Sequence, residues 1–297
     1  MQKIVPSIWF DHTAAEAVAF YTEHFPDSRV LHEQRYPSTG LPDFQREFAG
    51  EVLAIDFELR GFRFSAINAG PEFEVNQSIS FTLPFDEAAD PDARTTMQTL
   101  WTALAEGGQV MMPLAEYPFN PYYGWVRDRF GVGWQFILSD PQAGPGPAVL
   151  TSLLFGAQAQ NRADEALAFY SSLFPDGRIT MVARYPQPSG PAPEGAVMYS
   201  TMMVFDQSFT LMDSAVEQPD TFSPGVSLML LCADQADIDH YWTALSAVPE
   251  AEQCGWCVDR FGVSWQVVPA DLNEYLLTPE SYGAMLQMKK IELSGLG

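Results

Sequence analysis

The three cysteines have the greatest potential of any residues in this chain for nucleophilic, redox or metal chemistry, and two of them form a CxxC motif at residues 254–257. In redox proteins such a motif opens a helix, whose dipole lowers the pKa of the thiol. Here residues 258–262 (Val-Asp-Arg-Phe-Gly) follow it and predict a strand and a turn. The sequence has no second CxxC to complete a zinc site. We therefore expect small buried side chains, and the sparse, odd cysteine count is typical of a reducing compartment.

Carboxylate and amide side chains are the next candidates for chemistry. Asp128 and Asp259 each begin an Asp-Arg-Phe-Gly sequence whose glycine favours a turn with positive φ, so we expect both to be structural. Asn68 and Asp213 each end a predicted strand and are candidate polar groups of a pocket, although both residue types also suit turns. The sequence offers no clear pair of aspartates for acid–base work and no Ser-His-Asp set.

The elements that must position these residues occur twice, because rare motifs return in the same order. The spacing between the two occurrences is 149, then 141, then 131 positions, which indicates shorter loops in the second copy. The repeated motifs are Phe-Tyr at 20–21 and 169–170, Trp-Thr-Ala-Leu at 101–104 and 242–245, and Asp-Arg-Phe-Gly-Val at 128–132 and 259–263.

A short segment rich in glycine and proline, residues 142–148, separates the copies and predicts a linker. We therefore predict one domain at residues 1–141, a second at 149–270, and a C-terminal extension at 271–297.

Each copy shows the same alternation of strand and helix patterns. The first unit is predicted to have a strand at 5–10, a helix after the capping-box signature at 13–16, and strands near 29–36, 51–59 and 62–68. The same order then begins again. The chain is thus predicted to be an α+β protein built from four βαβββ units.

The composition limits the partners. A net charge of −23, from 38 acidic and 15 basic residues, disfavours nucleic acid and membrane surfaces and is typical of a soluble protein. No apolar run approaches the roughly 20 residues of a membrane helix, and the first residues lack the apolar stretch of a signal peptide. We expect a cytoplasmic protein.

The order of elements and two motifs resemble the vicinal-oxygen-chelate superfamily, which includes glyoxalase I, extradiol dioxygenases and bleomycin-resistance proteins. The motifs are the Phe-Tyr pair that ends the first helix and the Asp-Arg-Phe-Gly-Val-x-Trp-Gln strand. A Met-Pro-Leu segment at 112–114 and a Met-Lys-Lys-Ile tail at 288–291 resemble the PhnB-like branch, also labelled 3-demethylubiquinone-9 3-methyltransferase. The resemblance implies tandem glyoxalase-like domains, with curled mixed sheets that surround a pocket.

The resemblance also implies where metal ligands would lie. Chelating members carry a glutamate on the last strand, where this chain has Gln135 and Gln266, and a histidine on the first strand, near Ser7 and Ser152. Neutral glutamine is a much weaker cation ligand. The four histidines fall on helices, caps or a strand without a matching histidine in the other copy, and we interpret them as ordinary surface or cap residues. We expect no metal and no cofactor.

Three functions remain to be compared. The first is a metal-free domain that binds a small, partly apolar molecule, as drug-sequestering members of the superfamily do. The alternative is a metal-dependent enzyme of the glyoxalase or dioxygenase type, and the missing ligands weaken it. The least favoured is a methyltransferase, because no Gly-x-Gly-x-x-Gly sequence follows a predicted strand. The two copies are expected to pack as a pseudo-dimer within the chain, and further homodimerisation is left open.

The pocket is expected in the first copy. From Trp101 to Gly124 the chain runs 23 positions, whereas the matching segment of the second copy runs 13. The additional residues lie in segment 111–123, which is rich in methionine and aromatic residues and is expected as a loop over the pocket mouth. The alternative is that this loop seals the contact between the copies. The candidate pocket residues are Gln135 on the floor, Trp9 on the adjoining strand, Tyr123, Ser7, Asn68, Gln266 and Asp213.

Overall fold

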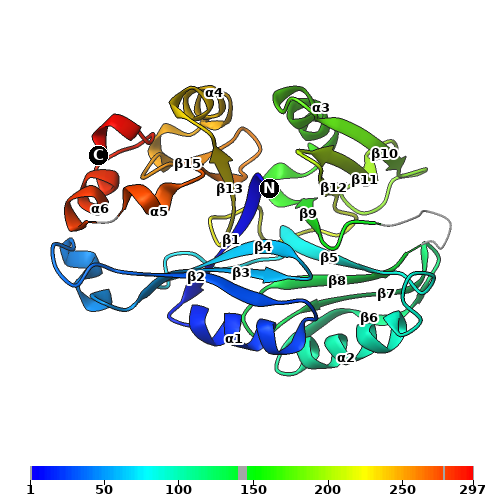
Figure 1. The fold of residues 1–297 in the computed structure, drawn as a ribbon. Helices are drawn as coiled ribbons and strands as arrows, with labels where there is room; N and C mark the ends of the chain where they lie inside the picture. The colour runs from blue at the N-terminus through cyan, green and yellow to red at the C-terminus, as the bar shows by residue number, and fades with distance from the viewer. Residues whose placement is uncertain (1, 140–145, 277, 297) are drawn as a thin grey trace.

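A computed structural model of the chain describes residues 2–139, 146–276 and 278–296 (Figure 1). Residues 142–145 of the predicted linker lie outside this range. The first copy contains β1 (Ile4–Asp11), α1 (Ala14–His24), β2 (Arg29–Arg35), β3 (Val52–Leu59), β4 (Phe62–Ala69), β5 (Ile79–Phe85), α2 (Ala93–Ala105), β6 (Gln109–Tyr117), β7 (Asn120–Arg127) and β8 (Gly133–Leu138).

The second copy and the extension follow in the same manner. Their elements are β9 (Leu150–Phe155), α3 (Ala163–Leu173), β10 (Arg178–Arg184), β11 (Val197–Val204), β12 (Gln207–Asp213), β13 (Val226–Cys232), α4 (Gln235–Leu245), β14 (Trp256–Val258), β15 (Ser264–Pro269), α5 (Leu272–Tyr275) and α6 (Pro279–Leu286).

The α+β fold class is as predicted, but the fourth unit is shorter than expected. After α4 the structure has two strands, β14 and β15, where each of the other units has three. The segment expected as a loop, residues 111–123, instead forms most of the β6–β7 hairpin. The shortening in the second copy therefore removed a strand at the edge of a sheet, and β14 became that edge.

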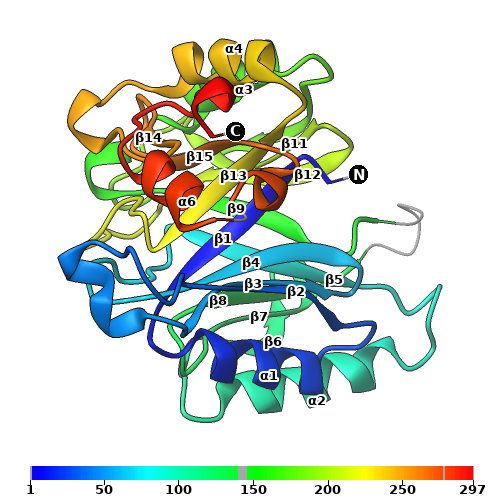
Figure 2. The ribbon, with the colours of Figure 1, turned by 60° about the vertical axis from the view of Figure 1, so that its left-hand side comes forward.

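Two mixed sheets run through both copies (Figure 2). Sheet A has the order β14-β15-β13-β1-β4-β3-β2, and sheet B has the order β10-β11-β12-β9-β5-β8-β7-β6. The copies join through antiparallel pairs, with Ser7 opposite Ser227 in sheet A and Ser80 opposite Ser152 in sheet B. The expectation that Trp9 and Gln135 lie in one sheet is wrong, because the two units of a copy belong to different sheets.

Each copy has an apolar core between its two units, covered by its helices. In the first copy Tyr21 of α1 lies against Trp134 of β8, with ring centroids 5.5 Å apart. The buried Asp128 accepts hydrogen bonds from the Tyr21 hydroxyl (2.7 Å) and the Trp134 indole (2.8 Å), and from backbone N–H groups of its own turn. Asp259 has the same four contacts in the second copy. Both aspartates therefore join helix, turn and strand, in agreement with the structural role predicted for them.

The C-terminal extension lies over sheet A. Tyr282 of α6 packs with Tyr36 and Phe48 of the first copy, and its hydroxyl donates to Gln45 Oε1 at 3.2 Å. Further on, the backbone carbonyl of Met288 accepts from Cys254 N at 2.8 Å, and Ile291 is fully buried in the main core. The extension is thus an integral part of the fold. Among the described residues, the structure has no helix long and apolar enough to cross a membrane.

Candidate functional site

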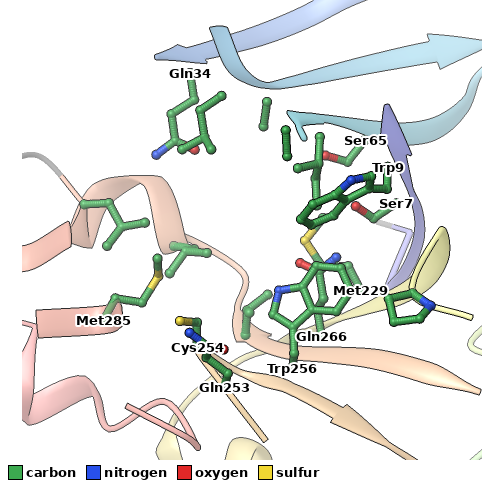
Figure 3. Close-up of a pocket in the computed structure, with 18 of the residues that line it drawn as sticks. Ser7, Trp9, Gln34, Ser65, Met229, Gln253, Cys254, Trp256, Gln266 and Met285 are labelled. Carbon is green, nitrogen blue, oxygen red and sulfur yellow. The ribbon is translucent and has the colours of Figure 1, made fainter. Parts of the chain in front are cut away.

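A cavity of about 680 Å³ lies on the face of sheet A that points away from the cores (Figure 3). Strands β3, β4, β1, β13 and β15 form its floor, residues 250–256 one wall, and α5 and α6 its cover. Its size is that of an ordinary small-molecule site.

A row of polar side chains crosses the cavity floor. Ser65, Ser7 and Ser227 are direct neighbours on β4, β1 and β13, and Gln266 Nε2 donates to Ser227 Oγ at 2.9 Å. The Ser7 side chain is 1% exposed, and its hydroxyl has no hydrogen-bond partner among the described residues. A buried hydroxyl without a partner is unfavourable, and this one lies beneath the floor, where a molecule in the cavity does not reach it directly.

Aromatic side chains form one wall of the cavity. Trp9 packs edge-to-face against Phe73 (4.9 Å between ring centroids) and Trp256 (6.3 Å). The Trp9 indole N–H donates to the carbonyl of Gly70 at 2.7 Å, which fixes the ring. Met285 of the covering helix lies across the cavity from these rings (Figure 3). The walls are therefore apolar and preformed.

Charged groups lie at the other end of the floor. Arg63 Nη2 contacts Asp56 Oδ2 at 2.6 Å, and both side chains line the cavity. Arg63 Nε is buried without a hydrogen-bond partner in the described part of the chain. His32 and Gln34 of β2 complete this end.

Sheet B carries a matching polar row, in which its own side chains satisfy Gln135 and Ser152, whereas Thr210 Oγ1, at the position of Ser65, is buried without a partner among the described residues. Gln135 Nε2 donates to Ser80 Oγ at 2.9 Å, as Gln266 does to Ser227. The Gln135 Oε1 atom accepts a hydrogen bond from the Tyr123 hydroxyl at 2.8 Å. The hydroxyl of Ser152, the counterpart of Ser7, pairs with Thr82 Oγ1 at 2.8 Å. The site in sheet B is thus closed by the protein.

Strand register shows why sheet A differs. Trp125 lies opposite Gln135, and Trp256 lies opposite Gln266, so the counterpart of Tyr123 in the second copy is Cys254. Cys254 lies in a turn with φ of 52°, and its small side chain leaves Gln266 uncovered.

Two further positions differ between the sheets by the same comparison of strand register. Sheet A has Ala54 where sheet B has Tyr199, and it has Met229 where sheet B has Thr82. Two phenol rings and one hydroxyl of sheet B are therefore missing from sheet A.

The seven candidate residues divide into three groups. Ser7, Trp9 and Gln266 lie together in the cavity. Gln135 and Tyr123 lie in sheet B, bonded to each other, so they do not line this cavity. The cavity floor combines β1, β3 and β4 with β13 and β15 of the second copy, so the structure does not bring Gln135 and Tyr123 together with Ser7, Trp9 and Gln266.

Asn68 and Asp213 form the third group, and neither lines the cavity. Asn68 Oδ1 accepts from the backbone N–H of Ala14 at 3.2 Å, at the start of α1. Asp213 accepts from Ala163 N (3.1 Å) and Val197 N (3.0 Å), which joins the start of α3 to β11. Both side chains hold a helix N-terminus against a strand, so they act in the fold.

No disulfide joins the three cysteines; Cys232 and Cys257 are buried, and Cys254 is partly buried. Burial raises the pKa of Cys254 to about 11 and that of Cys257 to about 12, which disfavours the reactive thiolate. Within the described residues, no group of three or more His, Cys, Asp or Glu side chains is placed to hold a metal ion. The donors at the expected ligand positions are the neutral side chains of Ser7 and Gln266, so the residues present do not fit a divalent cation.

Several cavity residues escaped the sequence reasoning, among them Trp256, Met229, Ala54 and Tyr282. A signal for Met229 and Ala54 existed in the repeat. Positions that carry tyrosine or threonine in one copy and small or apolar residues in the other mark where one site is filled and the other is open.

Comparison with known proteins agrees with this architecture. The family described as 3-demethylubiquinone-9 3-methyltransferase matches residues 2–137 and 147–268, once in each copy. A Bacillus cereus PhnB protein whose name carries the same description is 29% identical over 46% of this chain and 100% of its own, with a TM-score of 0.40. The search of curated proteins found no match.

Two full-length similarities concern the fold alone. Glyoxalase I from Zea mays covers 91% of this chain and 95% of its own at 10% identity, with a TM-score of 0.51. A Bacillus subtilis protein named as a candidate dioxygenase covers 97% of this chain and 90% of its own at 10% identity, with a TM-score of 0.50. Fold and repeat thus match the fold of glyoxalase I. The chain belongs to the PhnB-like, 3-demethylubiquinone-9 3-methyltransferase family, in two tandem copies.

Proposed function

We propose that this protein binds a small, partly apolar molecule in the cavity of sheet A without the help of a metal ion. The observation that carries the proposal is the asymmetry between the sheets. In sheet B, Tyr123 covers Gln135 and Thr82 pairs with Ser152, whereas the matching positions of sheet A hold Cys254 and Met229 and about 680 Å³ of space lies above the floor. Apolar walls with a few convergent polar groups are the usual make-up of a ligand site.

A metal-dependent enzyme of the glyoxalase or dioxygenase type is less well supported. Such chemistry requires a cation that polarises an oxygen or activates water. The floor offers serine and glutamine where charged or imidazole donors would be needed, and Asp56 at its far end is paired with Arg63. The donor set therefore favours binding over metal-assisted catalysis.

The methyltransferase activity in the family description has little support from the fold. Adenosylmethionine-type cofactors and dinucleotides are commonly held at the carboxyl end of a doubly wound parallel sheet. Here both sheets are mixed, and the paired neighbours include antiparallel strands in each. We therefore do not extend that activity to this chain.

The test uses N-phenyl-1-naphthylamine, a neutral dye whose fluorescence rises in apolar surroundings. A neutral probe is suitable because the chain carries a net charge of −23. Saturable binding at about one dye per chain, unchanged by prior treatment with a chelator, would support the proposal. The variant Ala54→Tyr, which copies the side chain found at this position in sheet B, should abolish the binding. Equal dye binding by this variant and the wild type would place the site elsewhere.

A further inference from the structure

Sheet B shows which chemical group the matching glutamine binds, because one of its own side chains occupies that position. There a phenol fills the site, with the Tyr123 hydroxyl donating to Gln135 Oε1 at 2.8 Å. The ring is buried, and burial raises the pKa of the phenol well above its usual range, so the hydroxyl remains a donor. Tyr199 lies close enough to contribute to that raised pKa.

Gln266 in sheet A is held in the same orientation but lacks the donor. Ser227 Oγ donates to the carbonyl of Ser7 at 3.4 Å, so it must accept from Gln266, and the amide nitrogen of Gln266 therefore faces Ser227. The carbonyl oxygen, Oε1, remains for the cavity, and no hydrogen bond to it occurs within the described residues. An acceptor that is fixed in this way selects a ligand that donates.

We propose that the ligand is a hydroxyaromatic molecule, whose phenol-type hydroxyl donates to Gln266 Oε1 in place of the missing tyrosine. The inference rests on the binding function proposed above and specifies the chemical class of its ligand. The Trp9 and Trp256 rings lie beside Gln266 and form an aromatic wall for the ring of the ligand (Figure 3).

The charges around the cavity favour a neutral hydroxyl over an acid. Glu72 and Glu250 line the cavity, and the chain as a whole is strongly acidic. Arg63, which also lines the cavity, is paired with Asp56 at the far end of the floor, and an ionised carboxylate could not donate to Gln266. A phenol with a pKa near 10 stays protonated at neutral pH and satisfies the acceptor.

The experiment compares p-cresol, the side chain of tyrosine, with toluene and p-methylanisole as competitors of N-phenyl-1-naphthylamine on the full chain. Toluene lacks the hydroxyl and p-methylanisole has it capped, so both leave Gln266 Oε1 unpaired. We expect p-cresol to compete about 5- to 150-fold more strongly than either. This comparison uses only the wild-type protein, so it does not depend on the folding of a variant.

Matched variants locate the effect. Gln266→Leu should remove the preference for p-cresol over toluene, whereas Gln135→Leu should leave it intact, because Tyr123 already occupies Gln135. If the dye binds but p-cresol competes no better than toluene, the hydroxyaromatic inference is wrong and the general binding function stands. If the dye does not bind the wild type at all, the binding function itself fails. A preference for p-cresol that survives in Gln266→Leu would also overturn the assignment.

Discussion

Replacing Asp128 by asparagine tests the structural role of the buried aspartates. Asparagine keeps one oxygen, which can still accept from the N–H groups of Phe130 and Val132 (2.9 and 3.0 Å). Its amide nitrogen then faces the Tyr21 hydroxyl and the Trp134 indole, both donors in the wild type. Tyr21 can rotate its hydroxyl to accept, but an indole only donates, so a fully buried N–H is left unpaired.

The expected loss is about 2–4 kcal/mol at neutral pH. An unpaired buried N–H costs about 1–3 kcal/mol, and exchanging a charge-assisted bond for a neutral one at Tyr21 adds about 1 kcal/mol. This is a large share of the roughly 5–15 kcal/mol that stabilises an ordinary domain. Urea unfolding followed by circular dichroism would measure it, and dye binding in the native state should not change.

The pH dependence has a definite sign. Burial raises the pKa of Asp128 above its unfolded value of 3.8, so folding favours the protonated form. The stability contributed by this group is fully present below pH 3.8 and is lost as the pH rises through the folded pKa. The difference between wild type and Asp128→Asn should therefore be larger at pH 4 than at pH 7. Asp259→Asn should behave alike, since its four contacts match. A loss below about 0.5 kcal/mol in both variants would refute the structural role.

Three further predictions concern other parts of the molecule. Ile291→Ala should lower the free energy of unfolding by about 2–4 kcal/mol, measured in urea, because this tail residue is fully buried; an unchanged midpoint would show that the tail is not part of the core. At pH 8 Cys254 should react with iodoacetamide about 100-fold more slowly in the native than in the unfolded chain, because its pKa is about 11, whereas that of an ordinary thiol is 9.0. The rate in the native chain should rise as the pH increases. Equal rates for the native and unfolded chain, followed by mass spectrometry, would contradict the burial of this thiol. Tyr123→Phe should lower the free energy of unfolding by about 1–3 kcal/mol, because it leaves Gln135 Oε1 unpaired. The variant should bind the dye as well as the wild type does. A loss of dye binding would place the site in sheet B.

The sequence predicts the local structure of this protein well, because that structure depends on patterns along the chain. The apolar spacing of α1 and the repeated Asp-Arg-Phe-Gly turns indicate the elements and the two copies, and the structure contains them. The resemblance to PhnB-like proteins likewise indicates the family to which the chain belongs.

The arrangement of the sheets lay beyond these patterns. Nothing in the spacing of Ser7 and Ser227 shows that they become neighbours across the two copies, since pairing between distant strands depends on tertiary packing. The sequence therefore groups Gln135 with Trp9, although the two residues lie in different sheets. The shortened segment between Trp242 and Gly255 predicts a lost cover, whereas the structure shows a lost strand at the sheet edge beyond β14.

The side-chain amides of Gln266 and Gln135 provide the most direct test of the central claim. In a ¹⁵N-labelled chain, the amide signals of each can be identified by their loss in Gln266→Leu and Gln135→Leu. Addition of p-cresol should shift the Gln266 signals in a saturable manner and leave those of Gln135 in place, because only Gln266 has a free carbonyl oxygen facing the cavity. Equal shifts of both pairs, or a shift of Gln135 alone, would contradict the assignment of the binding site to sheet A.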